Sequence, residues 1–328
     1  MKENEKNRLE KKMIGCILGS AIGDAIGARF EGHPYYNFPI ELLDSLFNDP
    51  NLIVGKYTDD TQMMKGILES LLKNKGLNGE DMAKTFVKNF DIYRGYGVGT
   101  TRVLEAIRKG ADWKGVAKLS FGGQGSFGNG AAMRICPVGL LYYFNTNKLS
   151  EIAKDSSVIT HTHKDAVEGA ILQAQAIALA LKEELGNFSP KKFLKELMKL
   201  TSSSHYEKKL NTINTLLNSS PTDIEVINKL GNKISAIESV PTAIYLFLQN
   251  YDSGFKTIIK NAIKLGGDTD TIACMTGAIA GAFLGIDKIP KNWIQTVEEN
   301  DFFIQSSKQL FLLSQKMQSN MRTEIQNS

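Results

Sequence analysis

The chain has 328 residues, of which 42% are hydrophobic and 23% charged, and its 39 basic and 35 acidic side chains leave a formal net charge of +4. This is the composition of a soluble globular protein, and the basic residues form no stripe interleaved with aromatic side chains, which argues against a nucleic-acid-binding groove. The three cysteines, Cys16, Cys136 and Cys274, form no CxxC pattern. They predict neither a zinc site nor a disulfide framework, but reduced thiols in a cytoplasmic protein.

The chain opens with the charged segment MKENEKNRLEKK, and we expect residues 1–12 to be flexible. Glycine and charged residues interrupt the apolar stretch that follows, so it predicts neither a signal peptide nor a membrane span. Asp24 and Glu31 lie in this stretch of small residues. Burying a charged side chain there is costly unless it has interaction partners or a functional role. Four glycines recur there at every fourth residue and share one helix face, which indicates close helix packing. They are Gly15, Gly19, Gly23 and Gly27.

Two short acidic clusters have the same design. Residues 58–61 (TDDT) and residues 266–271 (GGDTDT) each open an apolar segment with helical spacing. Asp and Thr are common helix-capping residues, so one such cluster alone would be explained by a cap. Two clusters with more carboxylates than a cap needs indicate a joint site, and its oxygen ligands suit Mg²⁺, Mn²⁺ or Ca²⁺. The alternative is a coincidence of two caps.

Two glycine-rich loops lie between the acidic clusters. Residues 95–99 (GYGVG) predict a turn, and residues 122–130 (GGQGSFGNG) form the densest loop. The second loop matches G-x-G-x-x-G, but no strand precedes it and no lysine follows its last glycine, which argues against a Rossmann site and a Walker A loop. Its backbone N–H groups, with a helix expected after it, can hold a diphosphate, and Phe121 and Phe127 can stack on a base. The alternative is a flexible connection.

Helical patterns fill the rest of the chain, and no segment alternates apolar and polar residues as a strand does. A long, mostly buried helix is predicted over residues 166–185. Ser189 followed by Pro190 predicts a helix start, and Thr222 opens a capping-box pattern.

Pro241 should kink or divide a further helix over residues 235–249. The most polar stretch, residues 201–222, could be a surface excursion, although it keeps leucine and isoleucine at helical spacing. We expect an all-α fold with one catalytic domain over residues 13–318, because two clusters that form one site are unlikely to lie in separate domains. Residues 319–328 are expected to be a frayed C-terminus.

Several segments together resemble the ADP-ribosylglycohydrolase family, which includes the dinitrogenase-reductase-activating glycohydrolases. The segments are GCILGSAIGDAIGARFEG, YTDDTQMM, RGYGVG, GQGSFGNGAAMR, ITH, GAILQAQAIALAL, ESVPTAIYLFL and LGGDTDTIACMTGAIAGAFLG. They occur in the family's order over most of the chain. Within the family the chain is most similar to the ADP-ribosylhydrolase three branch, which acts on serine-linked ADP-ribose, poly(ADP-ribose) and O-acetyl-ADP-ribose.

The resemblance implies a compact orthogonal bundle of α-helices with two Mg²⁺ ions, and Mn²⁺ stays open as the alternative metal. The implied metal ligands are Thr58, Asp59, Asp60, Asp268, Asp270 and Thr271. The implied substrate-binding residues are Gly95, Gly97 and Phe121 at the adenosine end, Gly125, Ser126, Phe127, Gly128 and Asn129 along the diphosphate and adenosine, and His161 at the distal ribose or diphosphate. Phe127 departs from the branch, which usually has a tyrosine there, so a hydrogen bond from a phenol is lost while ring stacking persists.

The implied reaction is hydrolysis of the glycosidic bond at C1″ of ADP-ribose, through an oxocarbenium-like transition state. Glu31, on a segment expected to be mobile, is the predicted general acid or base, and Asp24 is expected to support that segment. The expected partners are ADP-ribosylated proteins, poly(ADP-ribose) or small ADP-ribose esters, with no membrane partner and a monomeric chain. Three alternatives stay open: hydrolysis of ADP-ribosyl-arginine, a non-catalytic ADP-ribose-binding protein, and a Mg²⁺-dependent phosphohydrolase.

Overall fold

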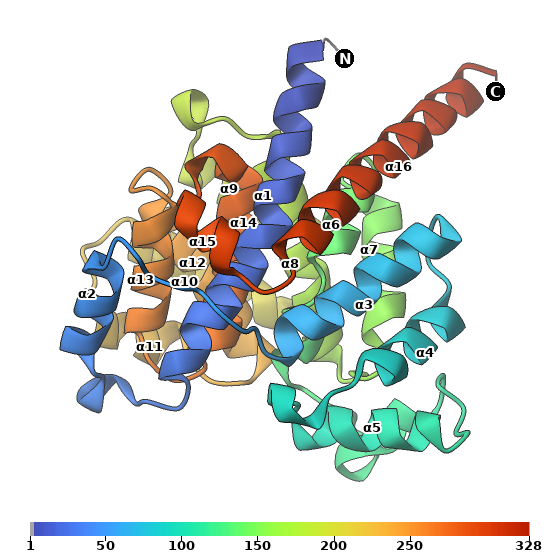
Figure 1. Ribbon diagram of the computed structural model, residues 1–328, viewed down its shortest axis with the longest axis horizontal. Coiled ribbons are helices and arrows are strands. Elements are labelled where there is room, and N and C mark those ends of the chain that lie inside the picture. The colour runs from blue at the N-terminus through green and yellow to red at the C-terminus, as the bar shows by residue number, and fades with distance from the viewer. Residues whose placement is uncertain (1–2, 328) are drawn as a thin grey trace.

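The structure is a computed structural model that describes residues 3–327, and no β-strand occurs in that part of the chain (Figure 1). The prediction of an all-α fold is therefore confirmed. The α-helices are α1 (Glu3–Gly27), α2 (Ile40–Asn48), α3 (Asp59–Asn74), α4 (Gly79–Asn89), α5 (Val98–Arg108), α6 (Cys136–Leu141), α7 (Thr146–Ser157), α8 (Lys164–Lys182), α9 (Pro190–Leu200), α10 (Ser204–Leu217), α11 (Asp223–Leu230), α12 (Ala236–Asn250), α13 (Phe255–Lys264), α14 (Thr269–Leu284), α15 (Lys291–Thr296) and α16 (Asn300–Asn327). Short 3₁₀ turns cover Ala28–Phe30, Tyr35–Asn37, Ile92–Arg94, Val116–Gly123, Asn129–Ala131, Leu185–Asn187 and Ile286–Lys288.

Helices α1 and α14 lie antiparallel and in closer contact than any other pair (Figure 1). The four glycines of α1 face α14, and a Cβ atom on any of them would lie only 2.1–2.6 Å from a backbone oxygen of α14. The last of these glycines, Gly27, contacts the backbone of Thr269, the first residue of α14. The expected close packing is thus present, and it places the acidic residues that follow α1 beside those that open α14.

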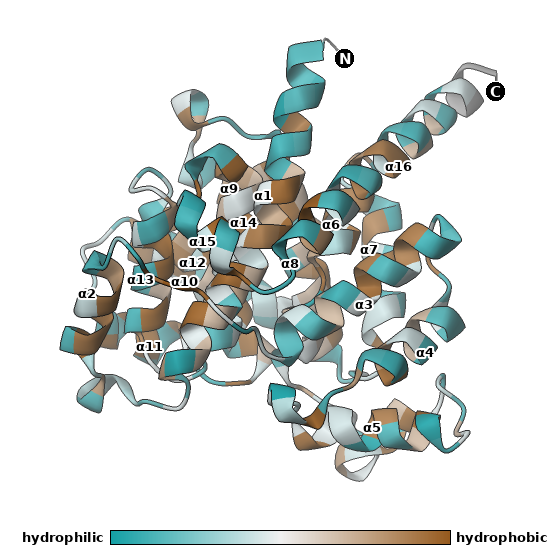
Figure 2. Ribbon diagram, in the orientation of Figure 1, coloured by the Kyte–Doolittle hydropathy of each residue, from teal (hydrophilic) through white to brown (hydrophobic). Residues whose placement is uncertain are grey.

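The other helices surround this pair. Helices α8, α12 and α13 pack against α14, and α16 packs against α1, α3 and α6. One connected cluster of buried apolar side chains includes residues of helices from α1 through α16. The brown, apolar faces of these helices turn toward one another, and teal residues mark the outer faces (Figure 2).

The helix-start signals in the sequence coincide with observed N-termini of helices. Ser189 caps α9 with Pro190 in its first turn, and Thr222 with Glu225 forms the capping box of α11. Pro241 lies inside a single continuous helix, α12, so it does not divide that segment.

The polar stretch over residues 201–222 is mostly helix. It forms α10, which packs against α12, and its buried residues include Leu210, Ile213 and Leu216. It is therefore part of the helical body and not a surface excursion.

The helices at both termini extend farther than the sequence predicts. Helix α1 begins at Glu3, so residues 3–12 of the segment expected to be flexible are helical, and Lys12 is buried with its ammonium donating to the backbone oxygens of Leu181 and Glu183. Helix α16 continues to Asn327. Residues 1, 2 and 328, which belong to the two terminal segments expected to be flexible or frayed, lie outside the described residues.

Among the described residues, the segment Glu3–Phe30 is long and apolar enough to pass a test for a membrane span. However, 89% of its apolar window is buried inside the protein. That is the environment of a core helix, as the glycine contacts with α14 also show.

Candidate metal and ligand-binding site

Asp24 organises the first acidic cluster. Its carboxylate is fully buried on α1 and accepts hydrogen bonds from the backbone N–H groups of Thr58 (3.1 Å to each oxygen) and Thr61 (3.0 Å). The hydroxyls of Thr58 and Thr61 donate to the same carboxylate at 2.8 and 2.6 Å. Asp24 thus fixes the first turn of α3, whereas the sequence had suggested that it supports the segment of Glu31.

The second acidic cluster is fixed by a tight glycine turn. Gly266 and Gly267 adopt φ angles of +68° and +76°, a region that favours glycine. Backbone hydrogen bonds join this turn to the segment after α1, from Gly32 N–H to the Gly267 oxygen (2.9 Å) and from Gly267 N–H to the His33 oxygen (2.8 Å). The segment that carries Glu31, which the family resemblance implied to be mobile, is therefore attached to the turn that precedes Asp268.

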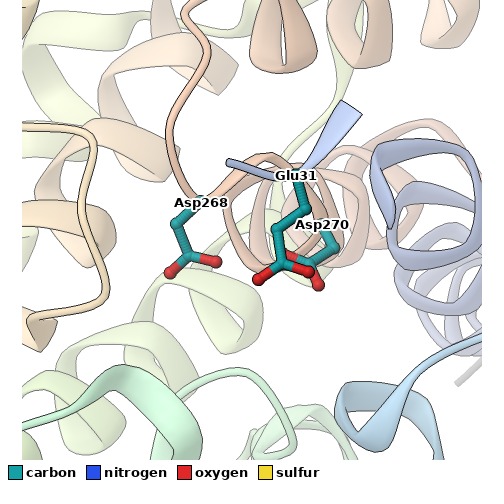
Figure 3. A group of neighbouring side chains, drawn as sticks. All are labelled: Glu31, Asp268 and Asp270. Atoms are coloured by element: carbon teal, nitrogen blue, oxygen red, sulfur yellow. The ribbon is translucent and has the colours of Figure 1, made fainter. Parts of the chain in front are cut away.

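These contacts bring three carboxylates together. Glu31, Asp268 and Asp270 each place a carboxylate oxygen within 4.8 Å of the other two, an arrangement that can hold a metal ion (Figure 3). The three side chains come from the segment that follows α1 and from the start of α14, and their oxygens point into one space. Glu31 is exposed, whereas Asp268 and Asp270 are buried.

The buried carboxylates repel one another. Burial raises the pKa of Asp59 to about 8, and the nearby Asp24 adds to the rise. Burial, Asp24 and Asp270 raise the pKa of Asp60 well above its usual range, and burial with Asp268 does the same for Asp270. Like charges and a low dielectric both disfavour the ionised forms, so a bound cation would stabilise this group.

The donors of this cluster fit a hard cation. One oxygen of Asp60, Oδ2, is buried without any hydrogen-bond partner, and an orphaned carboxylate oxygen is costly unless a cation fills the position. Throughout residues 3–327, the ion pairs with lysine or arginine involve none of the clustered aspartates and not Glu31. Asp60, Asp268 and Asp270 therefore form an oxygen-only set of the kind that Mg²⁺ or Mn²⁺ prefers.

Both acidic clusters open into one cavity of about 390 Å³, a size typical of small-ligand sites. The predicted site residues that line it are Glu31, Asp59, Asp60, Gly95, Gly97, Phe121, Ser126, Gly128, Asn129, His161, Asp268, Asp270 and Thr271. Val98, Gly99 and Gly130, from the two predicted glycine-rich loops, also line it. Thr100, Met133 and Ile234 are further lining residues that were not among the predicted site residues.

Three predicted site residues, Thr58, Gly125 and Phe127, are not part of this lining. Thr58 caps α3, and its hydroxyl donates to Asp24. Gly125 has φ +75°, and a Cβ there would lie 2.0 Å from the hydroxyl oxygen of Thr162, so this glycine allows a close approach behind the cavity. Phe127 is exposed, and its ring centroid lies 5.8 Å from that of Phe121.

The glycine-rich loop is held from both sides. Asn129 N–H donates to the Ile234 oxygen (2.9 Å) and Ala236 N–H donates to the Phe127 oxygen (3.1 Å), which attaches the loop to the start of α12. The Asn129 side chain donates to Asp268 at 2.6 Å and to the hydroxyl of Ser239 at 3.0 Å. Asn129 thus orients a carboxylate of the acidic cluster, a role beyond the substrate contact that the resemblance implies.

The helix expected directly after this loop is absent. The chain makes the 3₁₀ turn Asn129–Ala131, and α6 begins only at Cys136. The loop therefore has no N-terminus of an α-helix directly after it. Four of its backbone N–H groups already donate within the protein, those of Gln124, Gly125, Gly128 and Asn129.

Arg94 connects the GYGVG loop to the first acidic cluster. Its guanidinium donates to both oxygens of Glu298, at 2.6 and 2.8 Å, and to the backbone oxygen of Tyr57 at 2.7 Å. It also lies 4.5 Å from the centroid of the Tyr57 ring. Arg94 immediately precedes Gly95, so these contacts hold the loop beside Thr58. The sequence contained this arginine in the RGYGVG segment but gave no sign of its partner, more than two hundred residues away.

His161 is buried and neutral. Burial lowers its pKa to about 3, and the nearby Arg134 adds to this effect. A Cβ atom on Gly130 would lie 2.9 Å from Nε2 of His161, so the ring packs directly against the glycine-rich loop. Its other nitrogen, Nδ1, lies 2.7 Å from the hydroxyl of Thr160.

Comparison with known proteins gives a consistent result. The chain matches the family model described as ADP-ribosylglycohydrolase over residues 5–320. It is 36% identical over 340 residues to the ADP-ribosylhydrolase ARH3 of Homo sapiens, covering 90% of this chain and 93% of that protein. It is 38% identical over 320 residues to the ADP-ribosylhydrolase ARH3 of Xenopus tropicalis, covering 87% and 90%. A solved structure described as an ADP-ribosylglycohydrolase-related protein complex has the same fold, with a TM-score of 0.72 at 24% identity over 94% of this chain and 99% of that one.

Proposed function

Because this chain belongs to the ADP-ribosylglycohydrolase family and is a hydrolase that removes ADP-ribose, we propose that it cleaves the bond at C1″ of ADP-ribose with two Mg²⁺ ions. We propose serine-linked ADP-ribose, poly(ADP-ribose) and O-acetyl-ADP-ribose as its substrates. The similarity to ARH3 proteins of several vertebrates supports the choice of this branch. The observation that carries the proposal is the convergence of both acidic clusters and the glycine-rich loop on one cavity.

The proposed metal ligands are the residues of the two acidic clusters, Thr58, Asp59, Asp60, Asp268, Asp270 and Thr271. The unpartnered oxygen of Asp60 and the mutual repulsion of the carboxylates support this assignment. These residues would hold Mg²⁺, which would supply positive charge for the distal ribose hydroxyls and lower the pKa of a water molecule.

The remaining steps belong to the side chains and backbone of the protein. The glycine-rich loop and the ring of His161 also line the cavity, where they can bind the diphosphate. Phe121 is half exposed at the cavity wall and can stack on the adenine. These contacts would orient C1″ toward the carboxylates.

Glu31 is proposed to transfer the proton, as general acid toward the leaving oxygen or as general base toward water. Partial burial, Asp268 and Asp24 raise the pKa of Glu31, which brings it closer to the pH range where an acid–base catalyst is effective. Its carboxylate also lies near enough to Asp268 and Asp270 to contact a cation. Measuring metal affinity and rate together separates these two roles.

The test compares serine-linked, arginine-linked, polymeric and O-acetyl ADP-ribose substrates, with Mg²⁺ and after chelation, with the product identified by mass spectrometry. We expect free ADP-ribose from the serine-linked, polymeric and acetyl substrates only when Mg²⁺ is present. Faster release from the arginine-linked substrate would assign the chain to the arginine reaction. Release of phosphate would indicate a phosphohydrolase, and tight binding without release would indicate an ADP-ribose-binding protein.

The role of Glu31 has a matched control. Glu31→Gln should lower the rate by about 10²–10⁴ while leaving Mg²⁺ affinity within a few-fold of the wild type. Glu207→Gln, at an exposed glutamate of α10, should leave both unchanged. A Glu31→Gln protein with full activity at saturating substrate and Mg²⁺ would remove Glu31 from the mechanism.

A further inference from the structure

A buried chain of polar groups lies behind His161, on the side away from the cavity. Arg134 donates from Nη1 to the hydroxyl oxygen of Thr160 at 2.7 Å and from Nη2 to the backbone oxygen of Ser156 at 3.1 Å. The Thr160 oxygen in turn lies 2.7 Å from Nδ1 of His161. Arg134, Thr160 and Ser156 are at most 1% exposed, and His161 is 4% exposed.

The direction of these hydrogen bonds follows from the chemistry of Arg134. A guanidinium can only donate, so the Thr160 oxygen accepts from it. The hydroxyl has one hydrogen of its own, and among the described residues the only acceptor at hydrogen-bonding distance from it is Nδ1 of His161. The reverse arrangement, with Nδ1–H donating to Thr160, would leave the threonine hydrogen buried and unpaired, at a cost of about 1–3 kcal/mol.

Nδ1 therefore accepts a hydrogen bond and carries no proton. In a neutral imidazole the single proton must then lie on Nε2. Burial keeps the ring neutral, because it lowers the pKa of His161 to about 3.

The proton on Nε2 points to the ligand side of the ring. A Cβ on Gly130 would lie 2.9 Å from Nε2 and a Cβ on Gly128 would lie 3.6 Å from it, so this nitrogen is next to the backbone of the glycine-rich loop. His161 also lines the cavity. A hydrogen-bond donor at this position suits an anionic oxygen, such as that of a diphosphate.

We propose that Arg134 and Thr160 are positioning residues that hold His161 as its Nε2–H tautomer, so that the ring is a fixed hydrogen-bond donor to a phosphate oxygen of the ligand. The identity of that ligand as ADP-ribose rests on the proposed function, whereas the tautomer does not. His161 is then a binding residue that neither accepts nor gives up a proton during the reaction.

Arg134 fixes the direction of this buried chain of hydrogen bonds, although no carboxylate takes part in it. Its guanidinium stacks 4.9 Å from the centroid of Phe86 and forms no ion pair with an acidic residue of the described chain. Burial lowers its pKa to about 9, so it remains charged at neutral pH. A guanidinium held in place by Thr160 and Ser156 can only donate, and this keeps the hydrogen bonds directed from Arg134 to Thr160 and from Thr160 to His161.

The direct test is the tautomer of His161 in the wild-type protein. Long-range ¹H–¹⁵N correlation spectra at neutral pH distinguish the protonated from the unprotonated ring nitrogen, and His161→Gln assigns the signals among the four histidines of the chain. We expect a protonated Nε2 and an unprotonated Nδ1. A proton on Nδ1, or an equal mixture of the two tautomers, would overturn the proposal even if the protein hydrolyses ADP-ribose.

A matched pair of variants tests whether the Thr160 hydroxyl supports ligand binding through His161. Thr160→Val removes the hydroxyl at nearly constant size and should weaken ADP-ribose binding, measured by calorimetry, about tenfold. Thr160→Ser retains the hydroxyl and should bind within about twofold of the wild type. Equal weakening in both variants, or wild-type binding by a folded Thr160→Val protein, would contradict the proposal.

The two proposals fail in different ways. A wild-type protein that binds no ADP-ribose contradicts the proposed function but leaves the tautomer measurement valid. If Thr160→Val does not fold, the spectrum of the wild-type protein still decides.

Discussion

At the scale of single residues, the hydrogen bonds that Thr58 and Thr61 donate to Asp24 fix the first turn of α3. That turn carries Asp59 and Asp60, whose carboxylates line the cavity. Asp24 does not line the cavity itself, so it acts on a ligand through the turn that it fixes and through its charge beside Asp59 and Asp60. Residues that orient metal ligands commonly change metal affinity by 10–100-fold when they are replaced.

This gives the first prediction. Asp24→Asn should weaken Mg²⁺ binding at least about tenfold, because an amide nitrogen would face the donors of Thr58 or Thr61. Isothermal titration of the purified variant measures the effect without an activity assay. Asp155→Asn, at an exposed position on α7, is the control. Wild-type affinity in Asp24→Asn would show that the turn is held by other contacts.

A second prediction concerns the neutral state of His161. Its pKa is lowered from 6.5 to about 3, so the unfolded chain binds a proton between these values that the folded protein does not bind. The contribution of His161 to folding stability must therefore fall as the pH drops below 6.5, by about 2 kcal/mol at pH 5. Urea unfolding at pH 7.5 and pH 5 should show that the wild type loses about 2 kcal/mol more than His161→Gln. Equal losses in the two proteins would mean that His161 becomes charged in the folded state.

At the scale of the elements, the contact between α1 and α14 positions the site. A Cβ on Gly23 would lie 2.1 Å from the backbone oxygen of Ala273, so any side chain there must separate the two helices. Such a separation would move Asp24 on α1 away from Asp270 on α14. The helix pair therefore couples core packing to the geometry of the carboxylates.

The third prediction follows from this contact. Gly23→Ala should destabilise the protein by about 1–3 kcal/mol through overpacking, although alanine favours a helix. It should also weaken Mg²⁺ binding. Gly186→Ala, where no atom lies within 4 Å of the added Cβ, should change stability by less than about 0.5 kcal/mol. Chemical unfolding of both variants measures the difference, and equal stabilities would contradict the packing argument.

Signals that act over a few residues could be predicted from the sequence. The capping residues of α9 and α11, the glycine face of α1 and the two acidic helix starts all depend on spacing within one turn or one helix. The glycine spacing did not identify α14 as the partner. The hydrogen bonds of Asp24 to Thr58, of Asn129 to Asp268 and of Arg94 to Glu298 join distant segments and depend on the assembled core, which no local pattern encodes.

At the scale of the whole molecule, a chain with a net charge of +4 gathers carboxylates at one cavity. Burial and mutual repulsion raise the pKa of Asp59, Asp60 and Asp270, so the metal-free folded protein binds protons that the unfolded chain does not bind. The stability of the metal-free protein should therefore rise as the pH falls from 8 toward 6. A bound cation removes this dependence, because it stabilises the ionised carboxylates.

The fourth prediction uses this competition between protons and cations. Excess Mg²⁺ should raise the midpoint of thermal unfolding, and the rise should be larger at pH 8 than at pH 6. Differential scanning fluorimetry with Mg²⁺ or with a chelator measures the difference at each pH. A Mg²⁺ effect that is absent, or that is larger at pH 6, would contradict the proposed ligand set.

The proposed mechanism depends on the two acidic clusters forming one metal centre. The most direct measurement is anomalous diffraction from crystals of the protein soaked in Mn²⁺, which locates each ion independently of any activity. We expect two ions in the cavity, held between residues 58–60 on one side and Asp268, Asp270 and Thr271 on the other. Ions bound by only one cluster, or no ion in the cavity at saturating Mn²⁺, would contradict it.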